Sequence, residues 1–480
     1  MTNLMVHTSA LLILIATLIG GTATSYAETP YIQQEHEFDS LDRYRTITLN
    51  SMIEQGIRKN FDQNLRNYQE QISQLNYSNL RDKFWMPSIQ LQMSSVERVR
   101  RLKSGGDGGS ARNNSPAGTI GVNFGDYTLY NWGKDFARYQ QNRSLLLQEQ
   151  STLKSDRRKL KHQIIIHFFQ LVTSKNIEKI YRERLQKASF IYRLNREKVT
   201  IGKVSKQEYY LARNEYLMAQ EHYHTAKMNH DLTEEQVATL IADPPGTRYV
   251  IREELDYRIF SVPFKESNEL AQKNSSTINN HHALVENAKQ ELVIEKKERL
   301  PLPKFTVNLG AYQHTFSRNG GDTSYLTAQG DKNLDIIATI NASWALTGDG
   351  GLLNHRKTEL ARLSYHYATT QLRQAKHQTM SAIQALYRSI ISYENQIKIL
   401  KVAVESSEKS FNIIMENYLA RKTSFINYKS ALRDLTNYRA SLAQAINTHL
   451  RNKVTLATTI GVDDFPGENF ELLAKREQTK

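Results

Sequence analysis

The 480-residue sequence contains no cysteine, only 9 prolines and only 3 tryptophans. Without cysteine there is no disulfide framework, no thiolate metal site, no thiol nucleophile and no lipid anchor on an N-terminal cysteine. After residue 27 no run of about 18 apolar residues occurs, which excludes a helical inner-membrane protein and leaves a β-barrel as the only way to span a bilayer. A Gly-x-Gly-x-x-Gly after a strand, a P-loop and a His-Glu-x-x-His are missing too. We therefore predict no enzyme, no catalytic residue, no cofactor and no metal site.

The first 27 residues also lack Lys, Arg, Asp and Glu. An apolar stretch from Leu11 to Ile19 precedes Ser25-Tyr26-Ala27, which is typical of a secretory signal peptide and its cleavage site. The net charge of +14 raises the question of nucleic acid, but the basic residues are spread through helical segments and interleaved with Glu. We expect export, a solvated basic helix surface and no nucleic-acid partner.

An internal repeat with a period of roughly 217 residues determines the expected architecture. Residues 84–91 match residues 300–307, a helix end followed by a proline and a strand. Farther along, five residues of the first half fall opposite five of the second without a gap: Glu197, Lys203, Ser205, Tyr209 and Ala212 face Glu416, Lys422, Ser424, Tyr428 and Ala431. The same order of elements is therefore expected twice: helix, strand, loop, strand and two long helices.

Four segments alternate apolar and polar residues with period two, the pattern of strands with unlike faces. They span about 88–97, 118–129, 304–314 and 334–346, long enough to cross an outer membrane at a tilt. The connections from Arg98 to Ala117 and from Thr315 to Asn333 are rich in Gly, Ser, Asn and Asp, as external loops of outer-membrane barrels are. Four strands cannot close a barrel, so several chains must contribute. A soluble sheet with one wet face is the alternative.

The remaining pattern is helical. An uninterrupted seam at spacings of three and four consists of Ile383, Leu386, Ile390, Tyr393, Ile397, Leu400, Val404, Ser407, Phe411, Ile414 and Tyr418. The first half keeps a broken version with Ile164, Leu171, Tyr181, Leu185, Ala188, Tyr192 and Val199. From Gly133 to Gly202 one helix of roughly 65 to 70 residues would measure about 100 Å, which suits a rod or tube.

The predicted division of the chain has five parts. These are a signal peptide at 1–27, a first repeat at 28–245, a connection at 246–275, a second repeat at 276–462 and a tail at 463–480. The connection, introduced by Asp-Pro-Pro-Gly from Asp243, and the tail after Pro466 are expected to form an equatorial belt around the tube. The charged end from Ala474 to Lys480 is expected to be disordered.

This doubled order, together with Gly202-Lys203-Val204-Ser205 at a helix-helix turn, resembles the TolC-like outer-membrane efflux proteins over roughly Thr46 to Gly461. The resemblance implies a homotrimer with a 12-stranded barrel and a 12-helix periplasmic tunnel. It also implies the outer membrane of a Gram-negative bacterium as location, and a periplasmic adaptor protein fed by an inner-membrane RND or ABC transporter as partners.

The resemblance places partner contacts at two helix turns, residues 201–205 and 420–424. Six residues are expected to form this adaptor-contact tip: Gly202, Lys203, Ser205, Arg421, Lys422 and Ser424. Gly202 is suited to a C-terminal helix stop, and residues 205–208 form a capping-box sequence for the next helix. In the second turn Arg421 replaces glycine, so a strained or altered turn is expected there.

By the same resemblance, an acidic residue past the first turn pairs with a tyrosine before the second and keeps the tunnel shut. Glu208 and Tyr418 occupy these positions. The alternative is that Glu208 only caps its helix and Tyr418 only fills the seam. Where relatives often carry an Asp ring, this sequence has Asn427, Lys429 and Ser430, so we expect a neutral or weakly anion-preferring constriction that divalent cations do not block.

Five basic residues of the first external loop are candidates to hold outer-membrane lipid phosphates, with a merely soluble loop as the alternative: Arg98, Arg100, Arg101, Lys103 and Arg112.

The expected function is a passive exit duct for efflux. A type I protein-secretion outlet is the alternative within this class. A periplasmic coiled-coil scaffold or adaptor without a pore is the alternative of another class; it would stay in solution without detergent.

Overall fold

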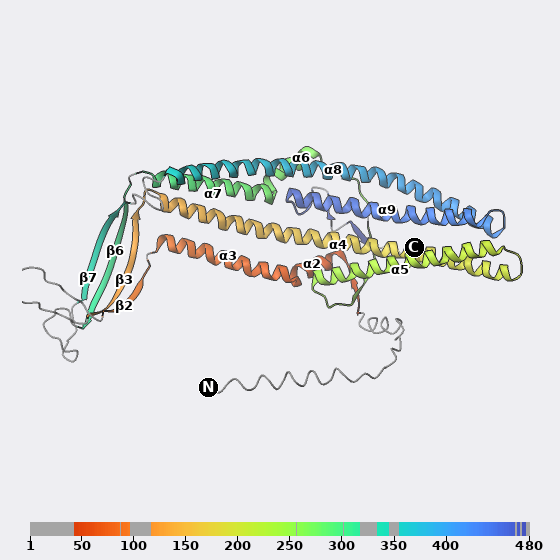
Figure 1. The fold of residues 1–480 in the computed structure, drawn as a ribbon, viewed down its shortest axis with the longest axis horizontal. Coiled ribbons are helices and arrows are strands. Elements are labelled where there is room, and N and C mark those ends of the chain that lie inside the picture. Colours follow the sequence, from red (N-terminus) through yellow and green to blue (C-terminus); the bar gives the residue numbers. More distant parts are fainter. Residues whose placement is uncertain are drawn as a thin grey trace, which may run out of the picture.

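The computed structural model is an elongated molecule with a β-sheet at one end and two helix turns at the other (Figure 1). It describes residues 43–86, 88–96, 117–255, 257–300, 302–316, 334–344, 355–465, 468–470 and 473–476. The expected signal peptide and most of both external loops, including the basic cluster at 98–112, lie outside the described residues. Across the described helices, none is both long and apolar enough to cross a membrane.

The chain contains the predicted order of elements twice. The first set is α3 (Phe61–Trp85), β2 (Gln90–Val96), β3 (Ala117–Tyr130), α4 (Lys134–Thr200) and α5 (Lys206–Ile241). The second set is α7 (Ser276–Glu298), β6 (Lys304–Phe316), β7 (Leu334–Ser343), α8 (His355–Leu419) and α9 (Phe425–Ile460). The mostly helical, twofold-repeated fold expected from the sequence is therefore present.

The four strands of the two sets form one antiparallel sheet in the order β2-β3-β6-β7. Leu91 pairs with Val122, Val122 with Ala311, and Ala311 with Ile336, so these side chains share one face. On this face Leu91 is 79% exposed and Ile336 71% exposed. On the opposite face Gln90 pairs with Asn123 and Asn123 with Gly310, so β2, β3 and β6 contribute two amides and a glycine there. One chain thus leaves an apolar sheet face uncovered.

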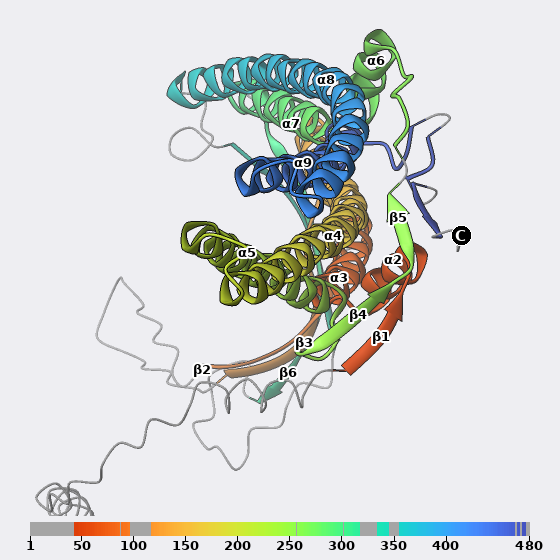
Figure 2. The same cartoon turned by 90° about the vertical axis from the view of Figure 1, so that its right-hand side faces the viewer.

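Two helical hairpins, α4 with α5 and α8 with α9, extend away from the sheet side by side (Figures 1 and 2). The long helix expected between Gly133 and Gly202 is α4, which runs for 67 residues without a break. Along α8 the predicted seam is buried at Ile383, Ile390, Ile397, Leu400, Phe411 and Tyr418. Toward the end of α4 the prediction was partly wrong, because the buried positions are Arg184, Ala188, Ile191 and Asn195, and Leu185, Tyr192 and Val199 are only partly buried.

Shorter elements lie along one flank of the bundle (Figure 2), about midway between sheet and turns (Figure 1). They are β1 (Arg43–Ile47), α2 (Leu49–Lys59), β4 (Thr247–Ile251), β5 (Glu253–Leu255), α6 (Phe264–Asn274) and β8 (Ala474–Arg476). β1 pairs in parallel with β4, and β5 pairs antiparallel with β8. Disorder was therefore wrongly expected for residues 474–476, because backbone pairing with β5 orders them.

The largest apolar core lies behind this flank and includes the fully buried Phe168 and Phe169 of α4. Lys453 of α9, with no exposed surface, donates to Glu468 Oε1 at 2.8 Å and to the Arg258 carbonyl at 2.8 Å. These bonds join the tail and the inter-repeat connection to the second hairpin. The flank therefore fixes the middle of both hairpins and leaves their distal ends to be held by other contacts.

Candidate functional site at the helical tip

The two distal turns have the same backbone geometry although their sequences differ. Gly202 has a φ of 70° and Arg421 a φ of 60°, both in the left-handed region. In the first turn Lys203 N donates to Lys198 O at 2.9 Å, and in the second Lys422 N donates to Asn417 O at 2.7 Å. These bonds satisfy carbonyls at the helix ends, as in a Schellman motif. Arg421 thus holds a conformation that favours glycine, at a cost of about 1 to 3 kcal/mol.

A serine begins the helix after each turn. The Ser205 hydroxyl accepts from Glu208 N at 3.1 Å, and the Ser424 hydroxyl accepts from Asn427 N at 3.4 Å. Each cap satisfies one backbone donor that the first helical turn leaves free. In a full capping box the Glu208 carboxylate would bind the Ser205 backbone, but it reaches across to Tyr418 of the other hairpin.

Tyr418 of α8 lies at the centre of the contacts between the two hairpins. Its hydroxyl donates to Glu208 Oε1 of α5 at 2.9 Å, and the hydroxyl oxygen accepts from Asn195 Nδ2 of α4 at 2.8 Å. Tyr418 is 7% exposed and Asn195 1% exposed. Burial raises the pKa of the Tyr418 hydroxyl, and the Glu208 carboxylate raises it further, so the hydroxyl stays protonated and can donate. One side chain therefore joins both helices of the first hairpin to the second.

An aromatic cluster supports this tyrosine. The ring of Tyr418 stacks on Tyr428 with centroids 5.3 Å apart and lies edge-on to Phe425 at 6.0 Å. Tyr428 is fully buried, burial raises its pKa, and its hydroxyl donates to the Lys187 carbonyl of α4 at 3.3 Å. The rings fix the orientation of Tyr418, because a fully packed ring has few rotamers available.

A cavity of about 360 Å³ opens beside Tyr418 between the two turns. Among the residues predicted for the tip and the gate, six line it: Lys203, Ser205, Glu208, Tyr418, Arg421 and Ser424. The structure thus brings together residues more than 200 positions apart in the sequence. Gly202 and Lys422 lie in the same two turns but do not line the cavity.

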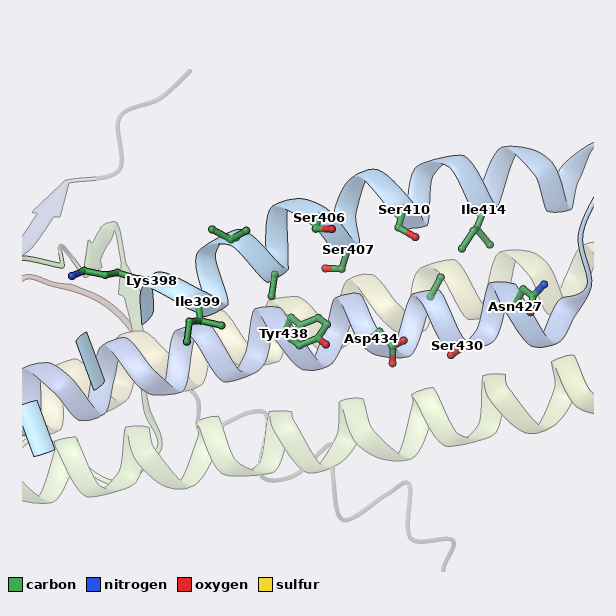
Figure 3. Close-up of a pocket in the computed structure, with 13 residues that line it drawn as sticks. Lys398, Ile399, Ser406, Ser407, Ser410, Ile414, Asn427, Ser430, Asp434 and Tyr438 are labelled. Carbon is green, nitrogen blue, oxygen red and sulfur yellow. The ribbon is translucent and has the colours of Figure 1, made fainter. Parts of the chain in front are cut away.

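The residues expected at the constriction separate into two places. Asn427 and Ser430 line a groove of about 960 Å³ between α8 and α9, where Asp434 lies one turn beyond Ser430 (Figure 3). Lys429 does not line this groove and instead places its ammonium 3.6 Å from Glu215 of α5. Since residues three and four apart share a helix face and residues one or two apart do not, Asn427 and Lys429 point different ways. The neutral constriction stays a prediction for the level of Asn427 and Ser430.

Sequence reasoning missed Asn195, Arg184 and Glu215. Arg184 and Asn195 occupy buried positions of α4 in line with Ala188 and Ile191, at spacings of four and three. Polar residues on an otherwise apolar stripe are the available signal, because a buried polar group needs a partner. The partners themselves come from other helices and were not visible in the sequence.

Comparisons with known proteins agree with this fold. Residues 59–243 match the family model described as outer membrane efflux protein, which confirms the resemblance. Among solved structures, VceC of Vibrio cholerae is 16% identical with a TM-score of 0.71, covering 86% of this chain and 96% of its own. CmeC of Campylobacter jejuni is 15% identical with a TM-score of 0.72, at 88% and 87% coverage. CusC is 13% identical with a TM-score of 0.71, at 86% and 92%. No curated protein matches the sequence.

Proposed function

We propose that this chain, which resembles the TolC-like outer-membrane efflux proteins, is the outer-membrane exit duct of an export machine. The observation that carries the proposal is the arrangement of Figure 1, in which a four-stranded sheet and two paired helix turns lie at opposite ends of continuous helices. At 1.5 Å per residue, a helix of α4's length spans about 100 Å. The sheet belongs in the outer membrane and the helices in the periplasm of a Gram-negative bacterium.

The apolar face shared by Leu91, Val122 and Ile336 supports a membrane location for the sheet. Exposing such an apolar face to water is unfavourable, whereas contact with lipid tails suits it. Four strands are too few to close a barrel, so three chains complete a 12-stranded barrel and a 12-helix tunnel. The working protein is therefore a homotrimer, and the duct supplies a water-filled path without a covalent step.

The tip is the place where a periplasmic adaptor binds and where the tunnel closes. Lys203, Arg421 and Lys422 give it a positive charge, and the cavity between the turns offers a partner both backbone and side-chain contacts. Tyr418, with Glu208 and Asn195, holds the two hairpins together in the closed form. An RND or ABC transporter in the inner membrane supplies the energy.

The decisive experiment is photo-crosslinking in cells from Lys422, an exposed residue of the second turn. Capture of a periplasmic adaptor is the expected result, and the transporter recovered with it distinguishes small-molecule efflux from type I secretion. A photo-crosslinker at the exposed Arg362 of α8, near the sheet end, is the control and should not capture an adaptor. If the protein without its signal peptide stays in solution as a monomer without detergent and captures no adaptor, it is a scaffold and not a duct.

A further inference from the structure

A second charged contact joins the hairpins about 10 Å above the Tyr418 contact, since Glu215 lies seven residues, or two helical turns, beyond Glu208 on α5. Glu215 is 1% exposed and Arg184 of α4 is 5% exposed. Both Arg184 Nε, at 3.2 Å, and Arg184 Nη2, at 2.6 Å, donate to the same carboxylate oxygen, Glu215 Oε1. Arg184 and Glu215 therefore form a buried ion pair within the first hairpin.

The other carboxylate oxygen, Glu215 Oε2, is buried and accepts no hydrogen bond from the described residues. The ammonium of Lys429, on α9 of the second hairpin, lies 3.6 Å from it. The Lys429 side chain is 29% exposed, so it reaches the buried carboxylate from the surface between the hairpins. A buried carboxylate oxygen without a donor is unfavourable, and the cation across the interface compensates for it.

We propose that Glu215 and Lys429 form a second latch between the two hairpins, which holds the tip closed independently of Tyr418 and Glu208. The inference rests on the proposed assignment of these turns to the periplasmic end of a duct. Arg184 is a positioning residue, because it holds the Glu215 carboxylate in place without itself crossing to the second hairpin.

Burial distinguishes this contact from the ion pairs of Arg439 on α9. Arg439 bridges to Glu183 of α4 in the other hairpin at 3.0 Å and to Glu408 of α8 in its own hairpin at 2.6 Å, but these carboxylates are 39% and 48% exposed. Exposed pairs of this kind contribute little to stability because water and salt screen them. Burial raises the pKa of the Tyr428 hydroxyl and the nearby Glu215 carboxylate raises it further, so this hydroxyl stays protonated beside the ion pair.

The arrangement predicts an order of effects. Lys429→Gln leaves the Arg184 and Glu215 pair balanced, so the first hairpin should fold and only the link to α9 is lost. Glu215→Gln removes the anion between Arg184 and Lys429, so the two cations then repel each other across the interface. The Glu215 change should therefore separate the hairpins more than the Lys429 change, and Lys429→Arg should keep them together.

The test is the distance between spin labels on Lys206→Cys of α5 and Lys422→Cys of α9's preceding turn, both exposed positions in a chain without native cysteine. Labelled chains are co-expressed with an excess of unlabelled chain, so that each assembly carries one label pair. Lys429→Gln should raise the ratio of separated to closed hairpins by about tenfold, as expected for losing a partly buried pair. Glu215→Gln should raise it further.

Lys409→Gln is the matched control and should leave the distances unchanged, because Lys409 on α8 forms a solvent-exposed ion pair with Glu405 of the same helix. Wild-type distances in both Lys429→Gln and Glu215→Gln would overturn the latch. Conductance of the same preparations in planar bilayers is recorded in parallel. An unmodified protein that forms no pore would refute the duct, while the label distances still decide whether the latch exists.

Discussion

Replacing Tyr418 with phenylalanine removes one oxygen from the contact between the hairpins and leaves the ring. The stacking on Tyr428 and the edge contact with Phe425 should persist, because they involve only the ring. The Glu208 carboxylate loses the hydrogen bond that the Tyr418 hydroxyl donates to it. The side-chain amide of the buried Asn195 loses the hydroxyl oxygen as its acceptor. The substitution is therefore a selective loss of polar contacts across the interface.

The magnitude follows from the charge and the exposure of the groups. A hydrogen bond to a charged group is worth roughly 1.5 to 3 kcal/mol, and Glu208 is partly solvated, so we expect a loss of about 1.5 to 2.5 kcal/mol from the closed form. That change increases the ratio of open to closed tips by roughly 10- to 70-fold. It should appear as more frequent or longer high-conductance states of the purified protein in planar bilayers.

Tyr210→Phe is the matched control, since Tyr210 lies on α5 near the same turn but is 60% exposed. It should leave conductance unchanged. If Tyr418→Phe assembles normally and conducts like the unmodified protein, the hydroxyl does not hold the hairpins together and the reasoning from its contacts is wrong.

Three further predictions concern stability. Arg421→Gly should stabilise the protein by about 1 kcal/mol in thermal unfolding, because glycine adopts the observed φ without strain. Gly461→Ala should destabilise by about 3 kcal/mol or more, since its Cβ would lie 2.2 Å from the Asn274 carbonyl oxygen, whereas Gly202→Ala meets no atom within 4 Å and should lose only about 1 kcal/mol. Burial lowers the pKa of His449 from 6.5 to about 4, so its contribution to stability is full above pH 6.5 and is lost as the pH falls toward 4, by up to roughly 3 kcal/mol. His449→Gln, measured by urea unfolding at several pH values, should flatten that dependence; an unchanged slope would contradict it.

The sequence by itself determined the order and kind of the elements. Alternation with period two marks the strands, spacings of three and four mark the seam of α8, and the repeat shows that each set occurs twice. These patterns can be read from the sequence, and their occurrence in the same order in both halves is unlikely to arise by chance. The Glu208 and Tyr418 pair was also anticipated, but from resemblance and not from the pattern.

Only the tertiary structure decided which side chains meet. Asn195 bonds to Tyr418, and Lys429 faces Glu215. Both contacts depend on how the hairpin of α4 and α5 is rotated and shifted along its axis relative to the hairpin of α8 and α9. The sequence of a single helix does not determine that rotation or that shift. The same holds for β8, whose residues lack an apolar pattern and are ordered only because β5 supplies backbone partners. Periodicity states which face of a helix is buried, whereas the partner on that face depends on the packing of helices that are distant in the sequence.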